Sequence, residues 1–370
     1  MLSIFIGPTD LRWRAILERA KHDVYHLPEY ITLCGKYEDS EPLAFFAEDG
    51  EAACLIPVLL KRIPGHLDAP SAWCDLASPY GYPAPLYTHP QNSELIGVFL
   101  NAFRCAADKL CACSVFLRLH PLFGGPVGVR MPFSACLRHG ETVSIDLTRP
   151  EDELWRQTRP DHRRGIRRLE ELNFAPLMDD WSLYGEFARM YRQTMVRLGA
   201  DEYYHFSDDY FGDLKASLGD KLHLCSVVSP EGRLAASGLY TTVDGVIEGH
   251  LAGSDPSYYR LAPTKLMQHF VGLWGKQRGC RVLHLGGGVG AQRDSLFEFK
   301  AGFSPDRHEF WTLRMIPNKR RYAALTLRAG LPLNPGADLE GEYFPPYRRC
   351  PIRLSCLTSR DLTAATFRAL

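Results

Sequence analysis

Short glycine turns between strand-like runs restrict the folds open to this chain more than any other feature. The turns are Asp49-Gly50, Pro230-Glu231-Gly232 and Asp244-Gly245. An Asp-Gly pair between two apolar runs is a strong signal for a β-hairpin, because both residues tolerate the left-handed backbone of a tight turn. The strands predicted around these turns are 43–48 and 52–60 in the first half of the chain, and 222–228, 234–242 and 246–253 in the second. Both halves are therefore expected to contain antiparallel strands.

A helix and a further strand follow these strands in both halves. Apolar spacing predicts helices over 94–110 and 264–278, and short apolar runs predict strands over 114–119 and 281–285. The order strand, strand, helix, strand thus occurs twice, although the two halves show no obvious residue identity. We predict an α/β (α+β) protein with two structurally related domains, each a mixed, mostly antiparallel sheet flanked by helices. The junction at 148–152 separates a first domain, 1–148, from a second, 149–311.

Composition excludes several classes of function. The 370 residues carry 43 basic and 43 acidic side chains, so a polyanion would have to be met by a local basic patch. The eleven cysteines include no C-x-x-C pair, which argues against a zinc ribbon or a redox motif, and we expect no metal. The N-terminal apolar run stops at Gly7-Pro8, and no later segment approaches the ~20 apolar residues of a membrane helix. We expect a cytoplasmic protein.

The stretch 281–310 contains the strongest candidate site. A short apolar strand ends in Gly286, Gly287 and Gly288, where a substrate could approach the backbone without meeting side chains. Downstream, Lys300 follows Phe299, and the surrounding phenylalanines would hold its ammonium near a partly dry wall. A plain loop with a solvated lysine remains the alternative. The stretch matches neither a Walker loop nor a dinucleotide-binding motif.

A second candidate is the arginine-rich segment 154–172. Arg163 and Arg167, and likewise Arg164 and Arg168, are four residues apart and share a helix face. Guanidinium groups pair well with phosphate oxygens, so this face could bind tRNA or another polyphosphate. The alternative is a solvated helix whose charge is balanced by neighbouring glutamates.

The loop 75–87 is rich in proline, glycine and tyrosine and would present Tyr80 and Tyr82 as a substrate wall, or would simply pack them. His284, Arg293 and Tyr258 complete the candidate substrate-binding residues.

Together with the element order, several motifs resemble those of the Fem family of aminoacyl-tRNA-dependent transferases, which have a duplicated GNAT-like fold. The motifs are SPYGYPAPL at 78–86, W-R-x-x-R-x-x-x-R-R-G-I-R-R at 155–168, RLG at 197–199, LAP at 261–263, FKAGF at 299–303 and YFPPYR at 343–348. The resemblance implies N-acylation, in which an amine attacks an activated acyl ester and Lys300, beside Phe299, stabilises the tetrahedral intermediate. It also implies that residues 312–370 complete the first domain.

The resemblance leaves the donor to be decided. GNAT proteins that use acetyl-CoA carry a glycine-rich turn before their long helix, whereas this chain has Arg260-Leu261-Ala262-Pro263-Thr264, with a proline that offers no N–H. Coenzyme A is thereby disfavoured, and we expect aminoacyl-tRNA as the donor without a cofactor. The expected acceptor is an amine of a peptidoglycan precursor or of a small peptide or nucleoside-type metabolite, and the expected state is a monomer or weak dimer. The alternatives are an acyl-CoA-dependent GNAT N-acyltransferase and a non-catalytic tRNA-binding module.

Overall fold

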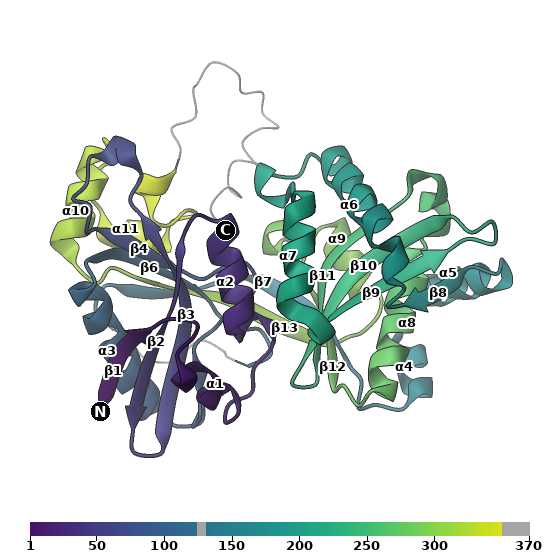
Figure 1. Cartoon of the computed structure of the whole chain (residues 1–370), viewed down its shortest axis with the longest axis horizontal. Helices are drawn as coiled ribbons and strands as arrows, with labels where there is room; N and C mark the ends of the chain where they lie inside the picture. The colour runs from purple at the N-terminus through teal and green to yellow at the C-terminus, as the bar shows by residue number, and fades with distance from the viewer. Residues whose placement is uncertain (124–130, 350–370) are drawn as a thin grey trace. The chain divides into compact units, whose positions relative to one another are not determined.

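The computed structural model describes residues 1–123 and 131–349 and shows a large, mostly antiparallel sheet flanked by helices (Figure 1). The predicted fold class is confirmed. The chain divides into two compact units: unit 1 comprises residues 1–139 and those from 310 onward, and unit 2 comprises 140–309. The division points lie inside two strands, β7 (Ser134–Asp146) and β13 (Arg307–Met315). The segment 350–370, which we assigned to the first domain, lies outside the described residues.

Unit 1 contains the first hairpin and its sheet. Its strands follow the order β1-β2-β3-β4-β6-β13, and β5 pairs with β3. The turn at Asp49-Gly50 has the expected geometry, because Gly50 has a φ of 60° and Asp49 pairs with Ala52. β4 and β6 run parallel and are connected through helix α3. The bounds are β1 (Leu2–Ile6), β2 (Glu41–Asp49), β3 (Ala52–Arg62), β4 (Cys74–Ala77), β5 (Leu86–Tyr87), β6 (Ala112–Arg118), α1 (Leu11–Leu17), α2 (Pro28–Tyr37), α3 (Ser93–Lys109), α10 (Lys319–Arg328) and α11 (Pro335–Glu340).

The core of unit 1 forms where α3 packs on the sheet. Phe99 and Phe103 of α3 are fully buried with Phe45 of β2. The end of the described chain is fastened to β4, because Tyr347 Oη donates to Asp75 Oδ1 over 2.6 Å and Arg348 Nε donates to Asp75 Oδ2 over 2.5 Å. The YFPPYR motif is therefore part of unit 1.

Unit 2 repeats the same pattern of pairing. Its strands follow the order β8-β9-β10-β11-β12-β7, and β11 and β12 run parallel through helix α8. The other pairs described for this unit run antiparallel. The bounds are β8 (Ala175–Met178), β9 (Leu222–Val228), β10 (Leu234–Val243), β11 (Val246–Ser254), β12 (Val282–Gly286), α4 (Glu151–Gln157), α5 (Pro160–Glu171), α6 (Tyr184–Leu198), α7 (Asp208–Leu218), α8 (Thr264–Gln277) and α9 (Ser295–Ala301).

The arginine-rich segment forms two helices, with a break between α4 and α5. Pro160 has no N–H and forces an extended backbone on the residue before it, so Arg159 has a ψ of 141°. The break places Trp155 and the arginine cluster on different helices, but Arg167 of the cluster still lies over the Trp155 ring at 5.3 Å.

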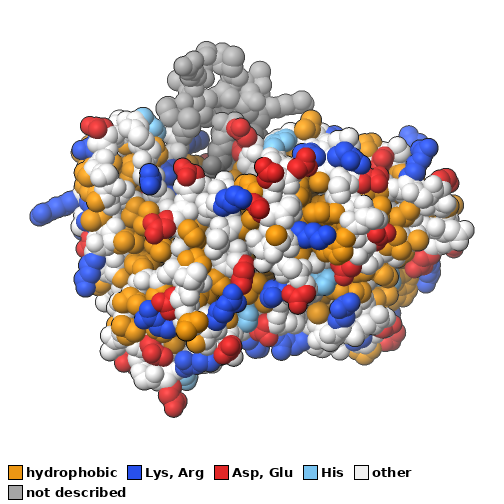
Figure 2. Space-filling view, in the orientation of Figure 1, with side chains coloured by type: hydrophobic (Ala, Val, Ile, Leu, Met, Phe, Trp, Pro, Cys, Tyr) orange, Lys and Arg blue, Asp and Glu red, His pale blue; other side chains and the backbone are white. Residues whose placement is uncertain are grey.

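The surface carries both signs of charge. Figure 2 shows basic and acidic side chains interspersed over the visible face, in keeping with the equal numbers in the sequence. Within residues 1–123 and 131–349, no helix has the length and apolar character needed to cross a membrane.

Candidate active site

Helix α9 presents Lys300 beside the glycine loop of unit 2. Asp294 begins the helix, since its Oδ1 accepts from the N–H of Phe297 over 2.8 Å and its Oδ2 from that of Val289 over 3.0 Å. Phe297, on the same short helix, is buried in the core of unit 2. The cap and this anchor fix the direction in which Lys300 leaves the helix.

The Lys300 side chain is half-buried and reaches the loop. Its Nζ donates to the main-chain oxygen of Gly287 over 2.5 Å. Desolvation lowers the pKa of Lys300 to about 8, while Asp294 and Glu248 act in the opposite direction. An ammonium has three hydrogens, so the contact with Gly287 leaves donors for an oxyanion. The direction of this pKa shift is the one that a partly dry environment causes.

The glycines of the loop allow two segments of the main chain to pack closely against each other. A Cβ on Gly287 would lie 2.9 Å from the main-chain oxygen of Glu141, and one on Gly288 would lie 2.2 Å from that of Gln292. Gly286 has a φ of 72°, in the region that favours glycine. The loop therefore needs glycine to fold against β7 and around Asp294, a reason different from the open approach that we expected.

A buried polar chain crosses three strands beneath the loop. His284 of β12 places Nδ1 2.8 and 3.0 Å from the two carboxylate oxygens of Glu248 on β11, and Nε2 2.9 Å from Oγ1 of Thr142 on β7. All three residues are buried. We call Glu248, His284 and Thr142 the three-strand polar chain. The sequence analysis named His284 but missed its two partners, although an acid inside the apolar run of β11 was a signal for Glu248.

Two other candidates of unit 2 lie apart from these contacts. Arg293 is exposed, pairs with Glu141 and lies over the Phe297 ring at 5.4 Å, so it borders the loop. Tyr258 packs edge-on against Phe174 at 5.6 Å and adjoins the core of unit 2. Among the described residues, no hydrogen bond or ring contact joins Tyr258 to Lys300 or to the loop.

Tyr80 and Tyr82 belong to unit 1, where they line an aromatic cluster. Tyr30 Oη donates to the main-chain oxygen of Tyr80 over 3.2 Å, and Tyr82 makes edge contacts with Tyr25 and His120. Only glycine fits at position 81, because a Cβ there would lie 2.1 Å from the Tyr25 ring and because the φ of Gly81 is 95°. This loop is packed tightly against its own unit.

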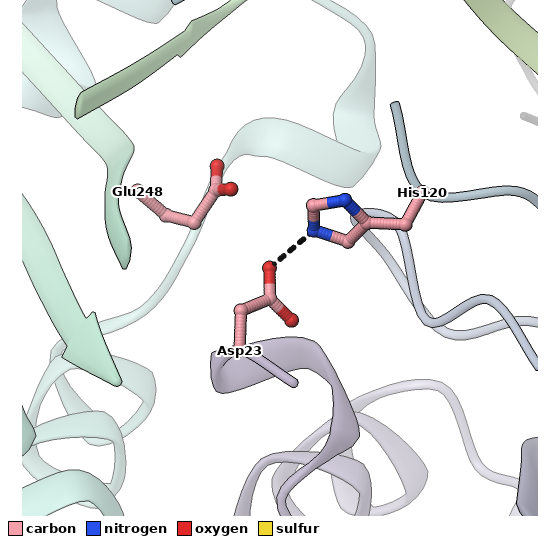
Figure 3. Close-up of side chains that lie close together, drawn as sticks. All are labelled: Asp23, His120 and Glu248. Carbon is pink, nitrogen blue, oxygen red and sulfur yellow. Dashed lines mark hydrogen bonds and ion pairs between the residues drawn. The ribbon is translucent and has the colours of Figure 1, made fainter. Parts of the chain in front are cut away.

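A buried Asp23–histidine network lies beside that cluster. His120 Nδ1 accepts from the N–H of Leu122 over 3.1 Å, so Nε2 carries the proton and donates to Asp23 Oδ2 over 2.7 Å (Figure 3). His26 Nδ1 is 2.8 Å from Asp23 Oδ1. Burial raises the pKa of Asp23, but the two histidines outweigh it and hold that pKa below the usual range. The sequence analysis did not identify this network, whose members are separated along the chain.

The arginine face of α5 is open to solvent. Arg164, Arg167 and Arg168 are exposed and Arg163 is half-buried, while His162, Ile166 and Leu169 point into the core. None of the four arginines forms an ion pair with a described residue, unlike Arg149, Arg156 and Arg159 nearby. A group of unpaired guanidinium groups on one face is what an anionic partner would require.

Helix α5 is also joined to the helix that carries Lys300. His162 Nε2 donates to the main-chain oxygen of Phe299 over 2.9 Å, and its ring packs on Phe303 at 4.7 Å. A Cβ on Gly302 would lie 2.5 Å from His162 Nε2, so glycine is needed at that position. Phe299, which we predicted as a catalytic neighbour of Lys300, thus supplies its carbonyl to α5.

Comparison with known proteins relates this chain to GNAT-like proteins. Residues 156–300, all within unit 2, match the acetyltransferase (GNAT) domain family. The chain has a GNAT-like fold. The structure of FemX is similar to it with a TM-score of 0.61 and 13% identity, over 84% of this chain and 97% of FemX. L-PGS from Bacillus licheniformis is similar with a TM-score of 0.52 and 14% identity, over 89% of this chain and 99% of that one. No curated protein sequence matches the chain.

The predicted resemblance to Fem-like GNAT proteins is confirmed at the level of the fold. At identities of 13% and 14%, these similarities establish the fold and do not identify the substrates.

Proposed function

We propose that this protein is an N-acyltransferase that moves an aminoacyl group from aminoacyl-tRNA to an amine, forming an amide bond. The proposed acceptor is a peptidoglycan precursor or a small peptide or nucleoside-type metabolite. The observation that carries the proposal is the position of Lys300, whose ammonium is half-buried, held by the Gly287 carbonyl and placed in the unit that matches the GNAT domain family.

Acyl transfer needs a cation where the carbonyl oxygen becomes an oxyanion. The acceptor amine attacks the ester carbon and the C–N bond forms. The C–O bond to the ribose of the tRNA then breaks, and the proton lost by the amine is gained by the ribose oxygen that leaves. A positioned donor for the intermediate oxyanion contributes on the order of 3 kcal/mol to lowering the barrier. Lys300 meets this need because partial desolvation strengthens its interaction with a developing charge. The remaining contribution comes from holding both substrates in place.

The start of helix α8 favours tRNA over a coenzyme A thioester. Pro263 occupies the N-cap and has no N–H, and the N–H of Lys265 is engaged with the main-chain oxygen of Ala262 over 2.9 Å. Fewer amides are thus available to a pyrophosphate at this helix end. The unpaired arginine face of α5 offers the alternative binding surface for a nucleic acid backbone.

The test is single-turnover transfer with a labelled donor, comparing charged tRNA with acyl-CoA. We expect transfer from charged tRNA, and Lys300→Met should lower its rate by roughly a hundredfold with little change in donor affinity. Lys276→Met is the matched control, because Lys276 Nζ also donates to main-chain oxygens of unit 2, those of Leu147 and Arg149, but lies outside the site. It should retain transfer.

The sign of the pH dependence identifies the role of Lys300. If the ammonium is the active form, transfer should fall as pH rises through about 8, after correction for the acceptor amine with the residual rate of Lys300→Met. A rate that rises through this range would make neutral Lys300 a base. Transfer from acyl-CoA alone would favour the thioester-dependent alternative, and normal transfer by folded Lys300→Met would leave a fold without this mechanism.

A further inference from the structure

The three-strand polar chain lies where the sheet of unit 2 opens toward the glycine loop. The parallel pairing of β11 and β12 ends with Glu248 opposite His284. On the other side of β12, the register with β7 shifts between His284 and Gly286. The polar chain is thus the last connection that spans all three strands before the loop begins, since only β12 and β7 pair again, at Gly286 and Val143.

Gly287 links Lys300 to the three-strand polar chain. A Cβ on Gly287 would lie 3.8 Å from Cγ2 of Thr142, and the carbonyl of Gly287 accepts the hydrogen bond from Lys300. An ionised carboxylate only accepts hydrogen bonds, so His284 Nδ1 carries the proton that binds Glu248. The carboxylate of Glu248 is therefore held in the core by His284, and contacts through His284, Thr142 and Gly287 connect it to the ammonium of Lys300.

The charged and titratable groups that bear on Lys300 come from several elements of unit 2. Asp294 precedes the helix, Glu248 comes from β11 and His284 from β12, while His162 of α5 contacts the Phe299 carbonyl. Arg293 and Arg307 lie over the Phe297 ring at 5.4 and 5.6 Å, and Glu298 is exposed. Two of these groups, Asp294 and then Glu248, oppose the desolvation that lowers the pKa of Lys300. Asp294 also caps α9, so Glu248 is the acid that can be changed without uncapping the helix.

We propose that Glu248 is a positioning residue for the aminoacyl transfer: its buried carboxylate, held by His284, keeps Lys300 in its charged form beneath the glycine loop. This role rests on the proposed function, because it matters for catalysis only if the ammonium acts in the transfer. The competing interpretation is that the polar chain only fastens three strands together. In that case its removal would lower stability and leave the titration of Lys300 unchanged.

The experiment measures Lys300 directly in Glu248→Gln, which keeps an oxygen to accept from His284. Trace acetic anhydride labels neutral amines, and mass spectrometry of the Lys300 peptide over a pH series gives its midpoint of titration. We expect the midpoint to move to lower pH, and single-turnover transfer at pH 8 to fall about twofold, with little change at pH 6.5, because loss of a nearby negative charge disfavours the ammonium. Glu298→Gln, on α9 but exposed, is the control and should change neither quantity.

The outcomes separate the two proposals. An unchanged midpoint in folded Glu248→Gln overturns the positioning role, even if transfer from charged tRNA is observed. If the wild-type protein transfers nothing but the midpoint of Lys300 is lowered in Glu248→Gln, the effect of Glu248 on Lys300 is supported and the proposed function is overturned. If Glu248→Gln does not fold, Glu248→Asp replaces it, because its side chain is one methylene shorter and moves the negative charge away. The midpoint of Lys300 should then move in the same direction but by less. An unchanged midpoint in folded Glu248→Asp would contradict the proposal.

Discussion

Units 1 and 2 have equivalent sheets but different chemistry at equivalent places. In each unit, three antiparallel strands lead to a helix and then to a strand parallel to the last of them, β4–α3–β6 in unit 1 and β11–α8–β12 in unit 2. After β12 the chain forms the glycine loop and α9 with Lys300. After β6 the chain reaches His120, which donates a hydrogen bond to Asp23.

The buried acids of the two units show what this difference means. Asp23 interacts with His26 and His120, which hold its pKa below the usual range, so its charge is used inside the network. Glu248 interacts with His284 and also opposes the lowering of the pKa of Lys300. The same frame thus holds a structural acid in unit 1 and, as we propose, a functional one in unit 2. The fold alone does not decide which unit is active.

The largest expected effect comes from removing the acid of unit 1. Asp23→Ala leaves buried donors of His120 and of the Tyr25 main chain without their acceptor, so the free energy of unfolding should fall by about 3 kcal/mol. Urea unfolding measures the change. Asp10→Ala, which removes the partly exposed cap of α1, should cost only about 1 kcal/mol.

A milder substitution at the same residue, Asp23→Asn, tests the comparison of the two units. Transfer per folded molecule should be unaffected in Asp23→Asn, because we assign no chemistry to unit 1. A folded Asp23→Asn protein that has lost transfer would show that both units contribute to the reaction.

A smaller effect is expected from the arginine face of unit 2. Changing Arg163, Arg164, Arg167 and Arg168 together to Gln should weaken tRNA binding and reduce the slope of log affinity against log salt by roughly 3, because each phosphate contact releases counterions. Thermal stability should change little, since surface charges contribute little to folding. Fluorescence titrations at several salt concentrations measure the slope.

The control removes the same number of charges from unit 1. Lys21, Lys109, Lys319 and Arg320 are exposed there, and their change to Gln should leave most of the slope in place. If both quadruple variants behave alike, tRNA is held by general charge and the face on α5 has no special role.

The last expected effect is the pH dependence of stability, and it concerns Lys300 itself. Its pKa is about 8 in the folded protein against 10.5 for the ordinary side chain, so the unfolded chain binds more protons between these values. The stability of the wild type relative to Lys300→Met should therefore rise as pH increases from 8 to 10.5. Urea unfolding of both proteins across this range tests it, and a constant difference would mean that Lys300 is solvated like an exposed lysine.

Local signals allowed much of the fold to be predicted. Strand β9 begins and ends where we placed it, and helices α3 and α8 agree with the predicted bounds to within one residue, because residues close to each end set these bounds. The hairpin turns were confirmed for the same reason. β1, β4 and β8 were missed because they are short, and their partners are fixed by the assembled sheet more than by their own residues.

The candidate site was only partly accessible to sequence reasoning. Lys300 and the glycines stand together in the chain, so they could be found. Glu248 and His284 meet because β11 and β12 run parallel in one particular register, and Thr142 joins them from β7. Such pairings depend on register, which a periodic pattern does not specify. The Asp23–His120 pair is hidden for the same reason, since 97 residues separate its members.

The exchange of the last strands has a consequence for synthesis. β7 follows β6 in the chain but pairs with β12, and β13 follows β12 but pairs with β6. As the polypeptide leaves the ribosome, the sheet of unit 2 is completed by residue 286, whereas β6, whose residues are all buried in the finished protein, keeps an uncovered edge until β13 emerges. The unit that starts first is finished last, so a nascent chain that stalls before residue 307 presents an apolar edge on which other chains can aggregate.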